Sequence, residues 1–143
     1  NTVCDFDPQE KRFEHSLDSA LVYLEKENAH INLLDAPGLN DFFGRAFSVL
    51  QAAETTAVVV NASSGIEPAT TAMMEHAKND DLCRMIIVNK IDAGELDLAG
   101  ILDQLQESFG NECLPLNLPA GGGGEVVDCF FVPSGQATDF TAG

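Results

Sequence analysis

The sequence predicts an α/β fold with a mostly parallel sheet and helices on both of its faces. Short apolar runs that end at polar turns alternate with segments whose apolar residues recur at helical spacing. This alternation predicts parallel strands joined by right-handed helical crossovers. The 143 residues, of which 45% are apolar, are enough for one domain with a hydrophobic core. Two polar tetrapeptides directly follow apolar runs, where a parallel sheet places its ligand-binding loops.

Strands are expected at the apolar, β-branched runs, which in chain order are residues 20–24, 31–34, 57–61 and 83–88, with weaker candidates at 114–118 and 126–132. Helices are expected at residues 41–54, 68–78 and 98–109. Pro68 suits a first helical turn, and Gly110 ends the last helix. The first 15 or so residues are polar and charged and are expected to form a loop, and the glycines at 121–124 a turn.

The chain is strongly acidic, with 7 Lys and Arg against 23 Asp and Glu and a net charge of −16. Such a surface repels phosphate backbones, so we do not expect this segment to bind nucleic acid directly. No apolar run approaches the ~18 residues of a membrane span. No basic-then-apolar leader is found either, which favours a cytoplasmic protein without membrane contact. The four cysteines show no C-x-x-C spacing, and we expect reduced thiols.

The first tetrapeptide, Asp35-Ala36-Pro37-Gly38, follows the apolar run 31–34. A carboxylate at a strand end suits Mg²⁺, which it usually holds through a water molecule. Gly38 lets a backbone N–H approach a γ-phosphate without interference from a Cβ. A segment that binds the γ-phosphate and is released after hydrolysis acts as a switch. Taken alone, the tetrapeptide fits an ordinary Asp-Pro-Gly turn equally well.

The second tetrapeptide, Asn89-Lys90-Ile91-Asp92, follows the apolar run 85–88 and is more specific. The Asp92 carboxylate can accept hydrogen bonds from N1–H and the exocyclic amine of guanine, a donor pair that adenine lacks. The Lys90 stem can lie against the purine, and the Asn89 amide can tie neighbouring loops together. A plain polar loop after a strand is the alternative. The occurrence of both tetrapeptides at the ends of predicted strands favours a GTP-binding protein.

Further residues extend the two motifs: Asp41-Phe42, Ala52-Ala53, Val58–Val60, Gly65, Phe109-Gly110 and Leu114–Pro119. Together they resemble the GTPase domain of translation elongation factor G and its bacterial paralogues, from about Asp5 to Asp128. The resemblance implies a P-loop NTPase-like fold, truncated before the first strand of its sheet. It implies a partial GTP-binding domain over residues 1–119, from switch I through the guanine-recognition motif. Residues 120–143 would then begin an insert subdomain.

The resemblance also implies GTP or GDP and Mg²⁺ as ligands, and the ribosome as the partner of the complete protein. GTP hydrolysis would drive a ribosomal step of protein synthesis such as translocation. The implied nucleotide-binding residues are Asp35, Ala36, Pro37, Gly38, Leu39, Asn89, Lys90, Ile91 and Asp92. Ser16 and Asp35 would bind the metal, since the segment 12–17 aligns with a switch whose Thr hydroxyl reaches Mg²⁺. Ser134-Gly135 matches a loop behind the guanine or, preferably, belongs to the insert.

Two departures from the family pattern bear on activity. No G-x-x-x-x-G-K-[ST] loop occurs, so the element that cradles the α- and β-phosphates is missing. We therefore expect a piece of a larger GTPase that is inactive by itself. Leu39 stands where translocases usually carry a His that orients the attacking water, so no catalytic residue is assigned and slow or assisted hydrolysis is expected. Two alternatives stay open: a ribosomal protection or release-factor relative, and a nucleotide-sensing interaction module with weak or no hydrolysis.

Overall fold

The computed structural model describes residues 3–94, 96–121 and 124–131. These residues form two compact units. The first contains the described residues up to Thr56 together with Glu75–Arg84, and the second contains Ala57–Met74 and the described residues from Met85 onwards. The Asp35 motif therefore belongs to the first unit, and the Asn89 motif to the second.

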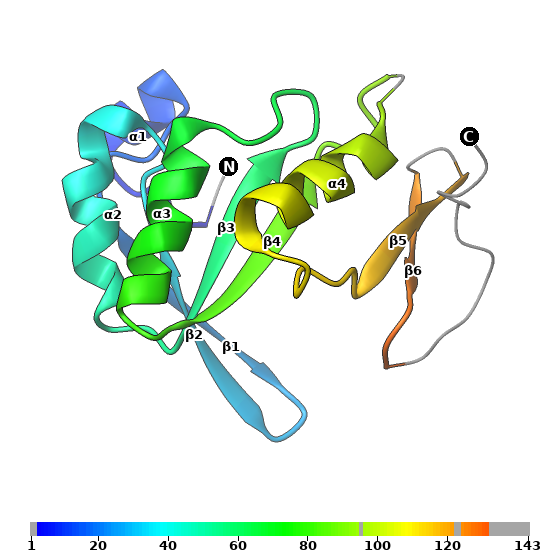
Figure 1. Ribbon diagram of the computed structural model, residues 1–143. Helices are drawn as coiled ribbons and strands as arrows, with labels where there is room; N and C mark the ends of the chain where they lie inside the picture. The colour runs from blue at the N-terminus through cyan, green and yellow to red at the C-terminus, as the bar shows by residue number, and fades with distance from the viewer. Residues whose placement is uncertain (1–2, 95, 122–123, 132–143) are drawn as a thin grey trace. The chain divides into compact units, whose positions relative to one another are not determined.

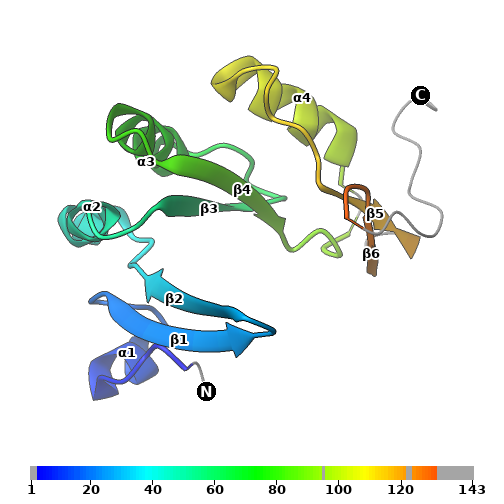
Figure 2. The ribbon, with the colours of Figure 1, turned by 90° about the horizontal axis from the view of Figure 1, so that it is seen from below.

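The first unit contains a hairpin of β1 (Ala20–Lys26) and β2 (Ala29–Asp35). The strands pair antiparallel, from Ala20 opposite Asp35 to Lys26 opposite Ala29. Figure 2 shows α1 (Pro8–Phe13) beside the end of the hairpin where β1 begins and β2 ends. The expectation of a mostly parallel sheet is wrong here, because a connection this short joins only antiparallel neighbours, whereas a parallel crossover needs about a dozen residues or more.

Helix α1 also corrects the expectation of a loop over the first 15 residues. The Asp7 side chain accepts a hydrogen bond from the Gln9 N–H (2.6 Å), and the Glu10 carboxylate accepts one from the Asp7 N–H (3.0 Å). This capping box, with Pro8 in the first turn, starts the helix. Its polar sequence concealed it because the buried residue of α1 is Glu10, so no apolar stripe marks the helix.

Helix α2 (Phe43–Leu50) is shorter than the predicted segment 41–54. A 3₁₀ turn, η1 (Asn40–Phe42), precedes it. Beyond Leu50 the backbone tightens into i→i+3 bonds, from the Ala52 N–H to the Val49 carbonyl (3.0 Å) and from the Ala53 N–H to the Leu50 carbonyl (3.1 Å). The predicted helix is too long because apolar residues continue past Leu50 at helical spacing. The tighter turn, although it is not α-helical, keeps Ala53 partly buried.

Strands β3 (Thr55–Asn61) and β4 (Cys83–Asn89), joined through α3 (Pro68–Asn79), form the one parallel pair of the described chain (Figure 1). The Cys83 N–H donates to the Glu54 carbonyl (3.1 Å) where both strands begin. The Ala62 N–H donates to the Asn89 carbonyl (2.9 Å) where both strands end. Here the predicted crossover is confirmed, since the predicted helix 68–78 has the length that a parallel connection requires.

In the second unit, which also buries Val58, Val60 and Met74, a cluster of buried apolar side chains is formed by Ala62, Ile101 and Leu105. The last two lie on α4 (Leu98–Phe109), whose N-cap Asp97 accepts a hydrogen bond from the Gly100 N–H (2.9 Å). Partly buried side chains of β4 and of the loop after it, including Val88 and Ile91, pack against this core. The helix that was predicted from the apolar stripe at 98–109 is confirmed.

Strands β5 (Asn117–Ala120) and β6 (Glu125–Asp128) form a second antiparallel hairpin. The predicted strand 114–118 thus lies further along the chain, and the predicted strand 126–132 begins and ends earlier. Residues 132–143, with Ser134-Gly135, lie outside the described residues. In the described part of the chain, no helix is both long and apolar enough to cross a lipid bilayer.

Leu105→Ala is expected to lower the free energy of unfolding by about 3 kcal/mol, because the buried side chain loses its transfer free energy and leaves a cavity. Urea unfolding, followed by circular dichroism, measures the change. Leu114 is 73% exposed and gives a matched control, since Leu114→Ala should change the stability by less than about 0.5 kcal/mol. Equal losses in the two variants would contradict this assignment of the core.

Candidate functional site

The first motif lies at the end of β2. Asp35 is the last residue of the strand and is half-buried, Pro37 is buried, and Gly38 and Leu39 are exposed. The Phe42 N–H donates to the Leu39 carbonyl (2.9 Å), so the chain turns into η1 directly after the motif. The motif therefore presents its Asp at a strand end, as the sequence predicted, and its Gly on the surface.

Gly38 is not required by packing within this chain. A Cβ placed on it would meet no atom within 4 Å, and its φ lies outside the left-handed region. The open space therefore leaves the Gly38 backbone accessible to an incoming group.

The thiol of Cys4, which the sequence does not connect with the site, contacts the Asp35 carboxylate. Cys4 donates a hydrogen bond to Asp35. Partial burial, this hydrogen bond, and the negative charges of Asp35 and Asp5 raise the pKa of the Cys4 thiol above its ordinary value. The thiol therefore stays protonated at neutral pH and remains a donor. No pattern in the sequence links Cys4 to Asp35, because the contact forms only when the chain folds back on itself.

Asp35 fits the way in which proteins hold Mg²⁺. That ion usually takes one or two protein carboxylates, completes its shell with waters and phosphate oxygens, and needs no all-protein cage. Among the described residues, no group of three or more His, Cys, Asp or Glu side chains is arranged to hold a metal. A carboxylate that receives one weak thiol donor keeps acceptor capacity for a metal-bound water. The Ser16 hydroxyl, the other predicted ligand, donates to Asp5 Oδ1 (3.0 Å).

The second motif begins at the last residue of β4. Asn89 Oδ1 accepts a hydrogen bond from the Lys90 N–H (2.8 Å), and Lys90 adopts a left-handed backbone with φ 59°. The Ala93 N–H then donates to the Lys90 carbonyl (3.2 Å), which closes the turn. Ile91 packs against the core of the second unit, whereas Lys90 and Asp92 are exposed.

This geometry separates the apolar residue of the motif from its polar residues. The apolar Ile91 fixes the loop to the core, and the polar side chains on either side of it stay at the surface. Lys90 shares its left-handed backbone with Glu14, Glu27 and Asp81, so this conformation closes the turn and does not by itself mark a site. The arrangement has an exposed carboxylate and an exposed lysine at the end of a parallel strand.

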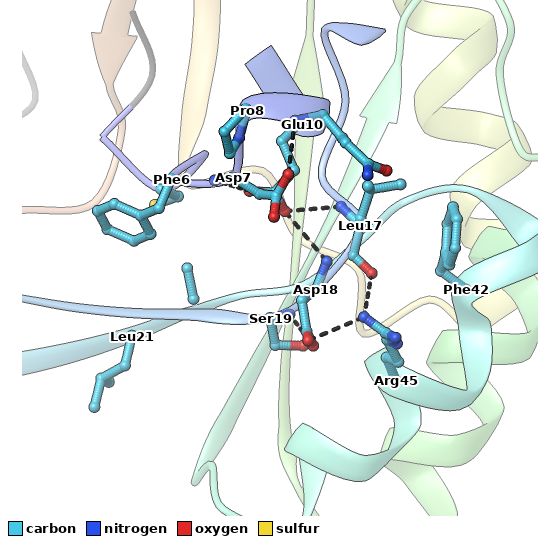
Figure 3. Close-up of a pocket in the computed structure, with 13 residues that line it drawn as sticks. Phe6, Asp7, Pro8, Glu10, Leu17, Asp18, Ser19, Leu21, Phe42 and Arg45 are labelled. Atoms are coloured by element: carbon cyan, nitrogen blue, oxygen red, sulfur yellow. Dashed lines mark hydrogen bonds and ion pairs between the residues drawn. The ribbon is translucent and has the colours of Figure 1, made fainter. Parts of the chain in front are cut away.

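A hollow in the first unit lies beside α1 and is lined by Cys4, Phe6, Asp7, Pro8, Gln9, Glu10, Leu17, Asp18, Ser19, Ala20, Leu21, Phe42 and Arg45 (Figure 3). None of the predicted nucleotide-binding residues lines it. Glu10 is only 5% exposed, and its carboxylate accepts the N–H groups of Leu17 (2.9 Å), Asp7 (3.0 Å) and Asp18 (3.3 Å). The N–H of Leu17, followed by those of Asp7 and Asp18, lowers the pKa of Glu10.

The chain matches known proteins over nearly its full length. The family described as the elongation factor Tu GTP binding domain matches residues 1–139. The elongation factor G-like protein of Mycobacterium tuberculosis H37Rv is 33% identical over 122 residues, which are 85% of this chain and 17% of that protein. Mitochondrial ribosome-releasing factor 2 of Culex quinquefasciatus is 33% identical over 135 residues (94% and 18%). Peptide chain release factor 3 of Rippkaea orientalis is 30% identical over 126 residues (88% and 23%).

Solved structures give the same picture. A crystal structure of a Thermus thermophilus protein matches with a TM-score of 0.82 at 31% identity, over 90% of this chain and 20% of that chain. The bacterial selenocysteine-specific elongation factor EF-Sec matches with a TM-score of 0.68 at 24% identity, over 77% and 20%, and shares the fold. The chain spans about one fifth of the length of these relatives.

Proposed function

Since the chain belongs to the elongation factor Tu GTP-binding domain family, with its P-loop NTPase fold, we propose that it binds GTP and GDP through the two motifs described above. In the complete protein, hydrolysis of GTP would drive a ribosomal step of protein synthesis in the cytoplasm, with elongation or translocation as the preferred step. Residues 1–119 would supply part of the GTP-binding domain. Residues 120–143 would begin its insert, and the hairpin of β5 and β6 crosses the boundary between the two parts.

The observation that carries this proposal is the conformation of the loop after β4. Ile91 packs against the core, and the exposed Asp92 carboxylate is thereby held at a fixed place beyond the strand end. Two acceptor oxygens on one carboxylate match the N1–H and the exocyclic amine of guanine. The left-handed Lys90 lies between Ile91 and Asn89, and its stem would cover the purine face.

The first motif would serve the phosphate end of the nucleotide. Asp35 would hold Mg²⁺ through a water molecule. The segment Ala36, Pro37, Gly38 and Leu39 would lie beside the γ-phosphate, and the accessible Gly38 N–H would donate a hydrogen bond to it. Bound Mg²⁺ would neutralise charge on the phosphate oxygens. Ser16 would turn from Asp5 to the metal. Leu39 supplies no hydrogen bond to a water, so hydrolysis would be slow or would use groups from another molecule.

A second candidate is a nucleotide-sensing interaction module with weak or no hydrolysis, and Leu39 is the observation that favours it. A release-factor relative within the same family is the other alternative. The similarity to peptide chain release factor 3 supports it, although the motifs described here do not separate it from an elongation factor.

Fluorescent GDP and ADP, titrated into the complete protein, test the proposal. We expect binding of GDP that excess unlabelled GTP displaces, and at least ~100-fold weaker binding of ADP, because adenine lacks the donor pair that Asp92 accepts. The 143-residue chain alone is expected to bind GDP more weakly than micromolar, since its sequence has no phosphate-cradling loop. Equal binding of GDP and ADP by the complete protein would overturn the proposal.

A further inference from the structure

Residues 14–19, here called the Ser16 loop, connect α1 to β1 and are held from two sides by charged side chains (Figure 3). On one side, the Glu10 carboxylate of α1 accepts the N–H groups of Leu17 (2.9 Å) and Asp18 (3.3 Å). On the other side, Arg45 of α2 donates from Nη1 to the Leu17 carbonyl (2.8 Å). The backbone of Leu17 is thus bonded through both its N–H and its C=O.

Glu10 is an anchor because its charge is buried and satisfied. An ionised carboxylate that is removed from water is costly unless hydrogen-bond donors replace the water. The donors here are the backbone N–H groups of Asp7, Leu17 and Asp18, so they come both from the start of α1 and from the Ser16 loop. The loop therefore cannot move away from α1 without exposing the Glu10 carboxylate to water or leaving it buried without hydrogen-bond donors.

Arg45 ties the same two residues to α2. Besides its bond to the Leu17 carbonyl, Nη1 lies 3.0 Å from Asp18 Oδ2. The side chains of Arg45 and Asp18 are 52% and 73% exposed, so their ion pair alone is weak. The hydrogen bond from Arg45 Nη1 to the Leu17 carbonyl is directional, so it orients the guanidinium toward the loop. A further contact joins the loop to the residues before α2, since the His15 ring lies 6.3 Å from the Phe42 ring, centroid to centroid.

We propose that Glu10 and Arg45 are positioning residues: Glu10 fastens the Ser16 loop to helix α1, and Arg45 fastens it to helix α2. Helix α2 follows the Asp35 motif through η1, and the loop carries Ser16. The two segments assigned to the γ-phosphate and the metal are therefore linked through protein contacts, and they move as one. This last consequence rests on the proposed function, whereas the linkage itself rests only on the contacts of Glu10 and Arg45.

Amide hydrogen exchange of the complete protein without nucleotide tests the linkage. Glu10→Ala is expected to raise the exchange rates of the Leu17 and Asp18 amides by about tenfold or more, because both lose a charged acceptor. Arg45→Met is expected to raise exchange in the Ser16 loop by about three- to tenfold. Arg45→Lys, which keeps a donor for the Leu17 carbonyl, should restore part of the protection. Arg84→Met removes an exposed arginine of the same unit and should leave the loop unchanged.

Exchange in the Ser16 loop that is the same in Arg45→Met as in Arg84→Met would overturn the proposal. This variant is the decisive one, because Arg45 is exposed and its loss does not threaten the fold. A wild-type protein that shows no guanine-nucleotide binding would refute the proposed function, while the exchange rates would still decide the linkage.

Nucleotide binding gives a readout that a merely structural role would not change. In Arg45→Met we expect GDP affinity to stay as in the wild type, and the preference for a GTP analogue over GDP to fall by about three- to tenfold, with Lys restoring part of it. An unchanged preference, or an equal loss of affinity for both nucleotides, would refute the positioning role.

Discussion

Asp92→Asn in the complete protein is expected to weaken GDP binding by about 100-fold or more and to create binding of xanthosine diphosphate. The carboxylate accepts two hydrogen bonds from guanine, whereas the amide keeps one acceptor and turns an N–H₂ donor toward the exocyclic amine. Hydrogen bonds to a charged group are worth roughly 1.5–3 kcal/mol each, so the loss of one bond, the loss of charge on the other and the opposition of two N–H donors together give the stated factor. Xanthine carries a carbonyl at the place of that amine and accepts from the Asn. Isothermal titration with both nucleotides measures the exchange of specificity.

Asp103→Asn is the control for this prediction. Asp103 is an exposed carboxylate on α4, in the same unit as Asp92, and its replacement changes the net charge equally. GDP binding that falls alike in both variants would mean that charge alone matters. GDP binding that survives Asp92→Asn would remove Asp92 from the base-recognition site.

Leu39→His in the complete protein is expected to raise ribosome-stimulated GTP turnover by about 10- to 100-fold. An imidazole nitrogen can accept from or donate to the attacking water, whereas leucine cannot orient it. Leu39 is 45% exposed and lies directly before η1, so the replacement has room and should change the free energy of unfolding by less than about 0.5 kcal/mol. Single-turnover hydrolysis with ribosomes present gives the rate.

Leu39→Met keeps an apolar side chain of similar size and should leave the turnover at its starting value. A turnover that stays unchanged in Leu39→His would show that a group from elsewhere already orients the water, or that the protein does not depend on hydrolysis. The second outcome would favour the nucleotide-sensing module over the enzyme.

The two motifs, their strands and the family could be identified from sequence because they are local features. A short apolar run followed by Asp35–Gly38 or Asn89–Asp92 needs no distant residue to be recognised. The helix at 98–109 could be predicted because its apolar face repeats at helical spacing, and the helix at 68–78 because Pro68 suits a first helical turn. The roles of the individual site residues stay predictions that the proposed variants test.

The strand pairing was only partly predictable. Strands 20–26 and 29–35 carry apolar residues that suit either direction of pairing, and only the two-residue connection between them fixes an antiparallel hairpin. The sequence pattern does not predict helix α1 for a related reason. Its start depends on the capping box of Asp7 and Glu10, which is a polar signal that the periodicity of apolar residues does not contain.

The sequence by itself determined the family, the two nucleotide motifs and the absence of a phosphate-cradling loop from these residues, because each is a property of neighbouring positions in the chain. Only the tertiary structure decided that Glu10 is a buried anchor, that Arg45 reaches the Ser16 loop, and that Cys4 lies on Asp35. These contacts join residues between 7 and 31 positions apart in the chain. A side chain can form such a hydrogen bond only after folding has brought the two residues within hydrogen-bonding distance.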